Sequence, residues 1–170
     1  MDLLIKNGTI VTAKDMYKAD IAVDNGKIQA IGTGFNDADY ENIVNADNKY
    51  ILPGAIDGHT HLALSFGGTV SSDDYYAGTR AAACGGTTTV FDFVNQDQGE
   101  NMLDAVKRRE AIASPDVAVD YSFHVGVSDV TTDGMLESME EAVEYGIPSF
   151  KVFMVYDYGV DDGSFFKVLT

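Results

Sequence analysis

The chain has 170 residues, of which 27 are acidic and 11 are basic, and its formal net charge at pH 7 is −16. A surface this acidic argues against binding to nucleic acids or to anionic membranes, because both attract basic proteins. Cys84 is the only cysteine, the N-terminus has no apolar leader and no apolar run reaches membrane-spanning length, so we expect a cytoplasmic protein without an intrachain disulfide.

Residues 1–52 have the pattern of a small antiparallel β-sheet module. Short apolar and β-branched runs alternate with turn residues, and we expect strands at 3–6, 9–12, 21–23, 27–31, 43–44 and 50–52. Asn7-Gly8 and Asp24-Asn25-Gly26 are hairpin signals, which predict pairing of the strands on either side of each. We interpret this module as a structural platform with no chemistry of its own.

From residue 53 onward, predicted strands alternate with predicted helices. The strands are expected at 56–62, 87–94, 117–127 and 149–154. The first helix should begin near 71–74 and end at Gly85-Gly86, and a fourth should begin near 161–164. Apolar stripes define the two helices between them: Met102, Ala105, Val106, Arg109 and Ala113 on one, and Met135, Leu136, Met139, Ala142 and Val143 on the other. This alternation predicts a parallel α/β sheet, either open or half of a (β/α)8 barrel.

Two of the three histidines, His59 and His61, lie one residue apart at the end of the first of these strands. Side chains alternate along a strand, so both imidazoles should point to one face and Thr60 to the other. Two imidazoles placed in this way can share a metal ion. The spacing alone also fits a strand with two hydrogen-bonded histidines. Lys151, at the end of a later strand, is a further candidate ligand, although by itself it also fits a surface lysine.

Several segments together resemble the hydantoinase/dihydropyrimidinase branch of the amidohydrolase superfamily. Residues 53–61 are similar to the first metal motif of the superfamily, and residues 149–156 resemble the metal-bridging lysine segment of the branch. Further similar segments are Phe66–Thr69, Asp73-Asp74, Gly78–Ala82 and Gly85–Thr88. The resemblance covers nearly the whole chain. It implies the N-terminal half of a metal-dependent (β/α)8 barrel, residues 53–170, preceded by an incomplete β-sandwich module, residues 1–52.

The resemblance also implies a chemistry. It implies a cyclic amidase in which a metal-bridging hydroxide opens the ring amide of a hydantoin or a dihydropyrimidine. Two divalent metal ions, usually zinc, would be held by His59, His61 and an N-carboxylated Lys151. The implied partners are a small cyclic ureide substrate and, at full length, other copies of the protein in a dimer or tetramer. In the family, two further histidines and an aspartate that acts as the general base come from later strands, so we expect the 170-residue chain to be inactive alone.

Other residues of the pocket follow from the resemblance or from their position. Tyr156 would donate a hydrogen bond to the oxyanion. The alternative interpretation of Tyr156 is a buried tyrosine that anchors a loop. Leu64, Phe66 and Phe153 should line the substrate pocket, although both phenylalanines also fit core positions. Asp92, at a strand end, either hydrogen-bonds to the metal-binding histidines and orients them or is an ordinary strand-end acid.

Three positions depart from the family or match none of its ligands. Ser65 stands where the branch usually has proline. Ala63 stands where dihydroorotases carry an arginine for the substrate carboxylate, which favours a neutral substrate here. His124 matches no family ligand and is interpreted either as a core residue or as a residue that supports the ligands without binding metal. Because some relatives keep this fold without catalysis, an assembly or binding protein is the alternative function.

Overall fold

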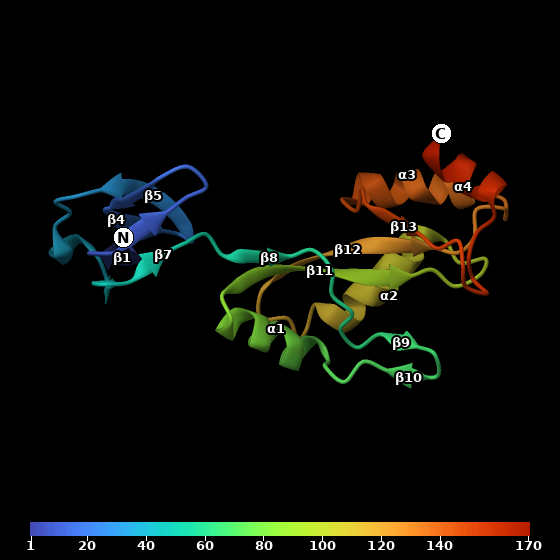
Figure 1. The fold of residues 1–170 in the computed structure, drawn as a ribbon, viewed down its shortest axis with the longest axis horizontal. Helices are drawn as coiled ribbons and strands as arrows, with labels where there is room; N and C mark the ends of the chain where they lie inside the picture. The colour runs from blue at the N-terminus through green and yellow to red at the C-terminus, as the bar shows by residue number, and fades with distance from the viewer. The chain divides into compact units, whose positions relative to one another are not determined.

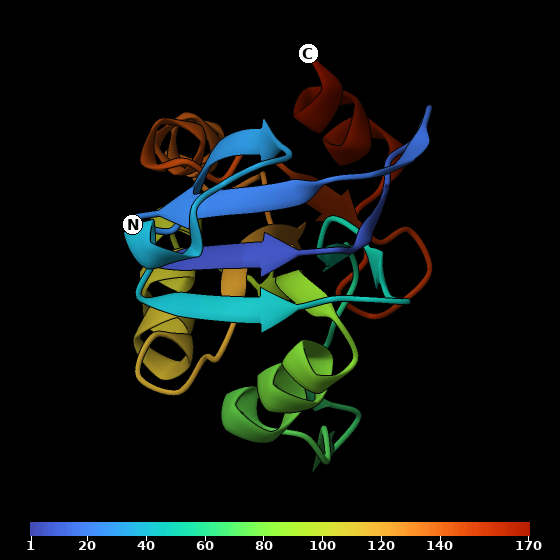
Figure 2. The same cartoon turned by 90° about the vertical axis from the view of Figure 1, so that its left-hand side faces the viewer.

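The computed structural model describes residues 1–170, which divide into two compact units, residues 1–53 and 54–170 (Figure 1). Figure 2 shows the same ribbon turned by 90°. The first unit consists of β1 (Leu3–Lys6), β2 (Thr9–Val11), β3 (Met16–Lys18), β4 (Asp20–Asp24), β5 (Lys27–Gly32), the short 3-10 helix η1 (Asp37–Asp39), β6 (Asn42–Asn45) and β7 (Tyr50–Ile51). No helix of the chain is long and apolar enough to cross a membrane.

The first unit is built from two sheets, with strand orders β5-β4-β1-β6 and β3-β2-β7. Ile10, Ala19 and Ile21 form its buried cluster. The predicted strands are present, and β3, an exposed strand without β-branched residues, is an addition. The predicted antiparallel pairing is present between β1 and β4, β4 and β5, and β2 and β3, but it is wrong for β1–β6 and β2–β7, which are parallel.

The two hairpin signals have different outcomes. Asn25 and Gly26 have φ angles of 51° and 70° and join the antiparallel strands β4 and β5, as predicted. Asn7-Gly8 forms no hairpin, because β1 and β2 lie in different sheets. Instead the Asn7 amide donates to Asp20 Oδ1 at 2.9 Å, and a Cβ on Gly8 would lie 2.2 Å from the Ile51 side chain. Gly8 is therefore required by close packing at a crossover between sheets.

The second unit carries a four-stranded parallel sheet in the order β13-β12-β11-β8. Its elements are β8 (Ala55–Asp57), β9 (Ser65–Phe66), β10 (Thr69–Val70), α1 (Tyr75–Cys84), β11 (Thr87–Asn95), α2 (Met102–Ala113), β12 (Asp120–Val127), α3 (Met135–Tyr145), β13 (Phe150–Val152) and α4 (Asp162–Leu169). The β9–β10 hairpin, which turns through Gly67 and Gly68 at φ 60° and 80°, was not anticipated from the sequence.

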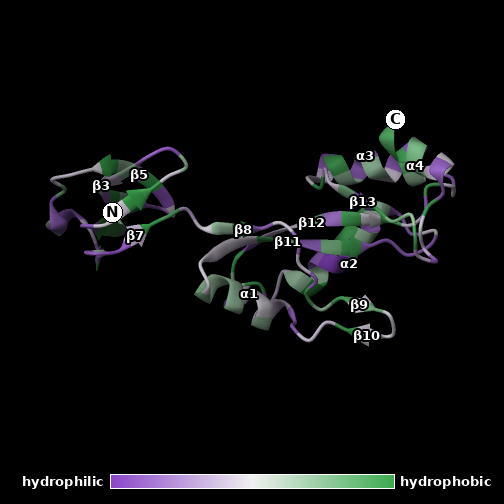
Figure 3. Ribbon diagram, in the orientation of Figure 1, coloured by the Kyte–Doolittle hydropathy of each residue, from purple (hydrophilic) through white to green (hydrophobic).

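The helices begin and end close to the predicted positions. The Asp74 side chain caps α1 by accepting from the Ala77 amide at 2.7 Å, and the Asp161 side chain caps α4 in the same way. All five residues of the predicted α2 stripe are buried. In α3, where hydrophobic and hydrophilic residues alternate (Figure 3), the prediction fails at Leu136 and Val143, which are exposed. Ser138 is buried instead, because its hydroxyl accepts from the Met102 amide.

Three of the four strands of the parallel sheet are shorter than predicted, whereas β11 matches its prediction to within one residue. β8 ends at Asp57 rather than Leu62, because the Leu62 amide bonds to the Asp92 side chain instead of a strand carbonyl. β12 begins at Asp120, and β13 covers only Phe150–Val152. Beyond β13 the chain turns back, and the Val160 amide donates to the Phe153 carbonyl.

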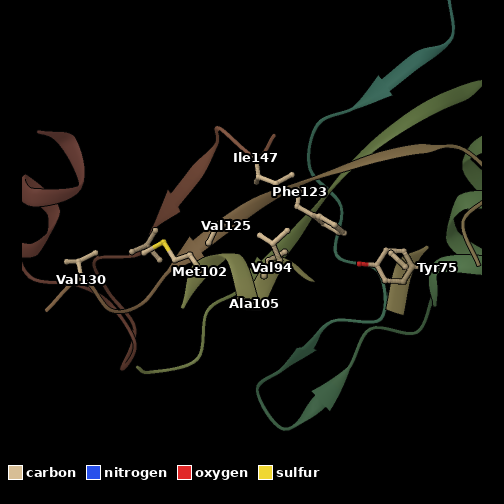
Figure 4. Close-up of a cluster of buried hydrophobic side chains, with 11 residues drawn as sticks. Tyr75, Val94, Met102, Ala105, Phe123, Val125, Val130 and Ile147 are labelled. Atoms are coloured by element: carbon tan, nitrogen blue, oxygen red, sulfur yellow. The ribbon is translucent and has the colours of Figure 1, made fainter. Parts of the chain in front are cut away.

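The two faces of the parallel sheet have different roles. Val94, Val125 and Val127 belong to the buried cluster that packs against α2, which Figure 4 shows together with Met102 and Ala105. Strand residues alternate in direction, so Phe93 and His124 lie on the opposite face. That face carries the candidate site.

Candidate active site

His59 and His61 follow β8 in an extended segment that runs beside β11. The Thr60 amide donates to the Phe91 carbonyl at 2.9 Å, and the His59 amide donates to Asp57 Oδ1 at 3.1 Å. The two imidazoles face each other with their Nε2 atoms 3.1 Å apart and their rings at 85°. The alternation expected of an extended segment therefore brings both rings to one face, although the strand itself ends at Asp57.

This pair has the geometry of two ligands of one ion. Two nitrogens bound to one tetrahedral zinc, each at about 2.0–2.1 Å, lie about 3.3 Å apart. The observed separation of 3.1 Å fits that arrangement. The pKa of His61 is lowered, mainly by loss of hydration and to a smaller extent by the nearby His59 and Lys151. A lowered pKa favours the neutral imidazole, which is the form that ligates metals. The chain brings no cluster of three His, Cys, Asp or Glu side chains together. The remaining predicted ligand is Lys151.

Lys151 reaches the same face from β13, where it is paired with Gly126 of β12. Its Nζ lies 4.5 Å from the centre of the Phe93 ring and 4.7 Å from that of Phe153. The Phe93 ring also lies 4.6 Å from the His59 ring and 4.9 Å from the His61 ring. The Phe93 ring therefore lies next to all three predicted ligands. Sequence reasoning missed it, although alternation along 87–94 was the available signal.

A cavity of about 370 Å³ opens beside these side chains. Its lining includes two predicted ligands, His61 and Lys151, and all of the predicted pocket and oxyanion residues, Leu64, Phe66, Phe153 and Tyr156. Ser71, Asn95 and Tyr158 also line it and were not anticipated. His59 and Asp92 are not among the lining residues.

Four aromatic side chains gather at one side of this cavity. The rings of Tyr156 and Tyr158 stack at 5.3 Å, Phe153 lies 5.6 Å from Tyr156, and Phe66 of β9 lies 6.1 Å from Tyr156. Phe66 and Tyr156 are both about half exposed, so neither is a core residue or a buried anchor. The four rings form an apolar wall that carries two phenolic hydroxyls, those of Tyr156 and Tyr158.

Asp92 does not touch an imidazole. It is fully buried, and its Oδ1 accepts from the Leu62 amide at 3.2 Å and from the Thr60 hydroxyl at 3.5 Å. Its other oxygen accepts from the Tyr75 hydroxyl and from Arg109. The carboxylate therefore acts on the backbone of the histidine segment.

His124 is half-buried beside Phe91 and Phe93, with ring centres 5.3 and 5.0 Å apart respectively. Its Nε2 lies 3.1 Å from the Gly58 carbonyl and its Nδ1 lies 2.6 Å from the Ser149 hydroxyl. A carbonyl only accepts, which assigns the proton to Nε2 and leaves Nδ1 to accept from Ser149. This imidazole connects the residue before His59 with a residue two positions before Lys151.

Residues 50–149, more than half of the chain, match the family model of the amidohydrolase family, and residues 1–51 match that of the urease alpha-subunit N-terminal domain. The chain belongs to the amidohydrolase family. It is 44% identical over 172 residues to a D-hydantoinase of Geobacillus stearothermophilus, covering 100% of this chain and 36% of that relative. It is 42% identical over 155 residues to a dihydropyrimidinase of Dictyostelium discoideum, covering 91% of this chain and 31% of the relative.

Solved structures agree with this membership. A D-hydantoinase structure superposes with a TM-score of 0.93 at 42% identity, covering 99% of this chain and 37% of that one. A dihydropyrimidinase from Brevibacillus agri gives a TM-score of 0.92 at 44% identity, covering 98% and 36%. The resemblance to the hydantoinase/dihydropyrimidinase branch is confirmed. Of the two architectures left open by the sequence, the amidohydrolase half barrel preceded by a small β-sandwich module is correct. The chain spans about a third of the relatives' length.

Proposed function

We propose that this amidohydrolase chain is the N-terminal part of a metal-dependent cyclic amidase that hydrolyses the ring amide of hydantoins or dihydropyrimidines. The observation that carries the proposal is the pair of Nε2 atoms 3.1 Å apart beside a cavity lined by Lys151 and Tyr156. The names of the relatives support the reaction class. The activity itself is assigned to a polypeptide of the relatives' full length that contains these residues.

We assign His59, His61 and Lys151 as ligands of two divalent metal ions, with zinc as the expected metal. When bound, such ions supply a water of lowered pKa and a polarised carbonyl. An ammonium has no lone pair and cannot ligate a cation. We therefore propose that the neutral Lys151 amine attacks carbon dioxide, which forms an N–C bond and releases a proton. The resulting carbamate would offer two anionic oxygens with which Lys151, together with His59 and His61, would hold the metal ions.

The chain's other residues then bind and orient the substrate. The Tyr156 hydroxyl donates a hydrogen bond to the oxygen on which charge develops. Leu64, Phe66 and Phe153 surround the substituent on the substrate ring. The general base is expected from outside these 170 residues.

We also propose that residues 1–52 and 53–170 are separate domains, which the compact units 1–53 and 54–170 support.

The substrate is expected to be a neutral ureide, because Ala63 offers no cation to a substrate carboxylate. The test is a side-by-side assay of the full-length protein with phenylhydantoin, dihydrouracil, allantoin and dihydroorotate. We expect turnover to be fastest with phenylhydantoin or dihydrouracil. A clear preference for dihydroorotate would contradict the assignment.

The alternative is a non-catalytic assembly or binding protein, and metal content separates the two readings. The convergence of His59 and His61 favours the enzyme. Full-length protein purified without chelators should contain stoichiometric divalent metal, whereas an assembly protein should contain none.

We further expect a cytoplasmic homo-oligomer, a dimer or tetramer, and light scattering of the full-length protein would measure its mass.

A further inference from the structure

Arg109, on α2, is a buried arginine that donates mainly to the backbone. Its side chain is 7% exposed. One terminal nitrogen donates to the Ala63 carbonyl at 3.1 Å, and the other donates to the Leu62 carbonyl and pairs with Asp92 at 2.8 Å. Its Nε is buried with no hydrogen-bond partner. The guanidinium is thus oriented toward two successive peptide groups at the cost of an unsatisfied donor.

Asp92 binds the preceding peptide group, through the Leu62 amide. Its Oδ1 accepts from the Leu62 amide, while its Oδ2 accepts from Arg109 and from the Tyr75 hydroxyl. Burial and the hydrogen bond to Asp92 raise the pKa of Tyr75, so the phenol keeps its donor proton. Both the amide and the carbonyl of Leu62, the residue after His61, are therefore bound by one buried ion pair.

The backbone at this point has an uncommon conformation. Ala63 has a φ of 45°, in the left-handed region that non-glycine residues rarely occupy. Its amide donates to the Asp73 carbonyl at 2.7 Å, and its carbonyl accepts from Arg109. A conformation of this kind persists where its surroundings fix it, and it concentrates at functional sites.

We propose that Arg109, Asp92 and Tyr75 form a buried positioning unit that fixes the Leu62–Ala63 turn and, through it, the His61 imidazole for metal binding. This inference rests on the proposed function. A buried ion pair contributes little to stability, because the cost of desolvating both charges offsets their attraction. Here the pair binds the backbone of Leu62 and Ala63, which follow the predicted ligand His61 by one and two residues, and this gives it a specific role. The metal-binding geometry is then set from the helix layer, on the other side of the sheet.

The test uses three conservative variants of the full-length protein: Asp92→Asn, Tyr75→Phe and Arg109→Lys. Lysine cannot span two carbonyls and a carboxylate at once. We expect each variant to bind zinc about 10- to 100-fold more weakly in a chelator competition. The cobalt-substituted proteins should show altered visible bands, and the metal-free proteins should exchange the Leu62 and Ala63 amide protons faster than the wild type.

Two matched controls come from exposed pairs nearby. Arg108, next to Arg109 on α2, pairs with Glu100 at 2.8 Å, and the Tyr145 hydroxyl donates to Glu110. Arg108→Lys and Tyr145→Phe should leave zinc affinity, cobalt bands and exchange at residues 62–63 unchanged. If Arg109→Lys does not fold, Tyr75→Phe, which removes one oxygen atom, carries the test.

The outcomes separate this inference from the function on which it rests. Variants that unfold at lower temperature but keep wild-type zinc affinity, cobalt bands and amide exchange would show a purely structural role and overturn the positioning unit alone. A wild-type full-length protein that binds no divalent metal would contradict the proposed function, and the positioning role would fail with it.

Discussion

Asp129 is a single carboxylate on which the turn after β12 depends. It is buried and accepts from the amides and hydroxyls of Thr131 and Thr132 and from the Gly99 amide. The Thr132 hydroxyl contributes most, and together these donors hold the pKa of Asp129 well below its ordinary value, although burial opposes them. The folded state therefore binds this proton less readily than the unfolded state. The resulting stability is fully present above the ordinary aspartate pKa of about 3.9 and is lost as the pH falls below it.

We predict that Asp129→Asn lowers the free energy of unfolding at neutral pH by about 1–3 kcal/mol, because an amide cannot accept at both former oxygens. The variant should also lose less stability than the wild type between about pH 5 and pH 3. Urea unfolding at both pH values measures this, and Asp133→Asn, at an exposed neighbour, is the control. Equal pH dependence in Asp129→Asn and wild type would refute the role of the carboxylate.

Lys151 provides the residue-level test of the metal assignment. In a full-length protein, Lys151→Ala should lose bound metal and ring-opening activity, because the carbamate that we propose could not form. Added short-chain carboxylic acids should restore a fraction of the rate, since they supply the missing carboxylate. His61→Ala should lose metal without rescue by acids, and Lys167→Ala, at an exposed position of α4, should change nothing. A Lys151→Ala protein with normal metal content and rate would reject the assignment.

At the scale of elements, the close packing of Ile51 against Gly8 predicts that a larger residue at position 8 destabilises the first unit. A methyl group there would meet Ile51 at 2.2 Å, next to β7. Gly8→Ala should therefore destabilise the first unit by about 1–3 kcal/mol, a typical cost of overpacking. In Gly32→Ala the nearest atom would be Phe35 at 3.8 Å, so this control should be close to neutral. Thermal unfolding followed by circular dichroism compares the two, and equal midpoints would contradict the packing argument.

The sequence predicts the positions of helices and strands better than it predicts which strands pair with each other. Helix ends were readable because caps such as Asp74 are local signals. The pairing of β1 with β4 and β6 was not, because Asn7-Gly8 has the same letters whether it closes a hairpin or crosses between sheets. The early end of β8 depends on Asp92, which is distant in sequence from Leu62.

Within the candidate site, the predicted side chains were those with a motif around them. His59, His61 and Lys151 stand in recognisable segments, and the structure places all three around Phe93. For Phe93 the only signal is alternation along the strand, which gives the face of the side chain but not its neighbours. The Asp92–Arg109 contact has no local signature, because a buried arginine fits any helix stripe. These contacts belong to the tertiary structure, where strand alternation and helix packing bring distant residues together.

At the scale of the whole molecule, the isolated chain has an exposed apolar surface in its second unit. β8 and β13 are the edges of the parallel sheet, and Ile56 on β8, Val155 after β13 and Leu169 on α4 are each at least 67% exposed. Unpaired strand edges and apolar patches promote association. The chain also spans only about a third of its relatives' length.

We therefore predict that the isolated 170-residue chain self-associates and shows no ring-opening activity, because two histidines and one lysine supply too few ligands for two metal ions. Light scattering and a phenylhydantoin assay with added zinc measure both properties, with the full-length protein as the positive control. Adding a separately produced remainder of the full-length protein should reduce the association, since complementary barrel strands would cover the same edges. A sequence-verified 170-residue monomer with robust metal-dependent ring opening would show that these residues already contain a complete catalytic site.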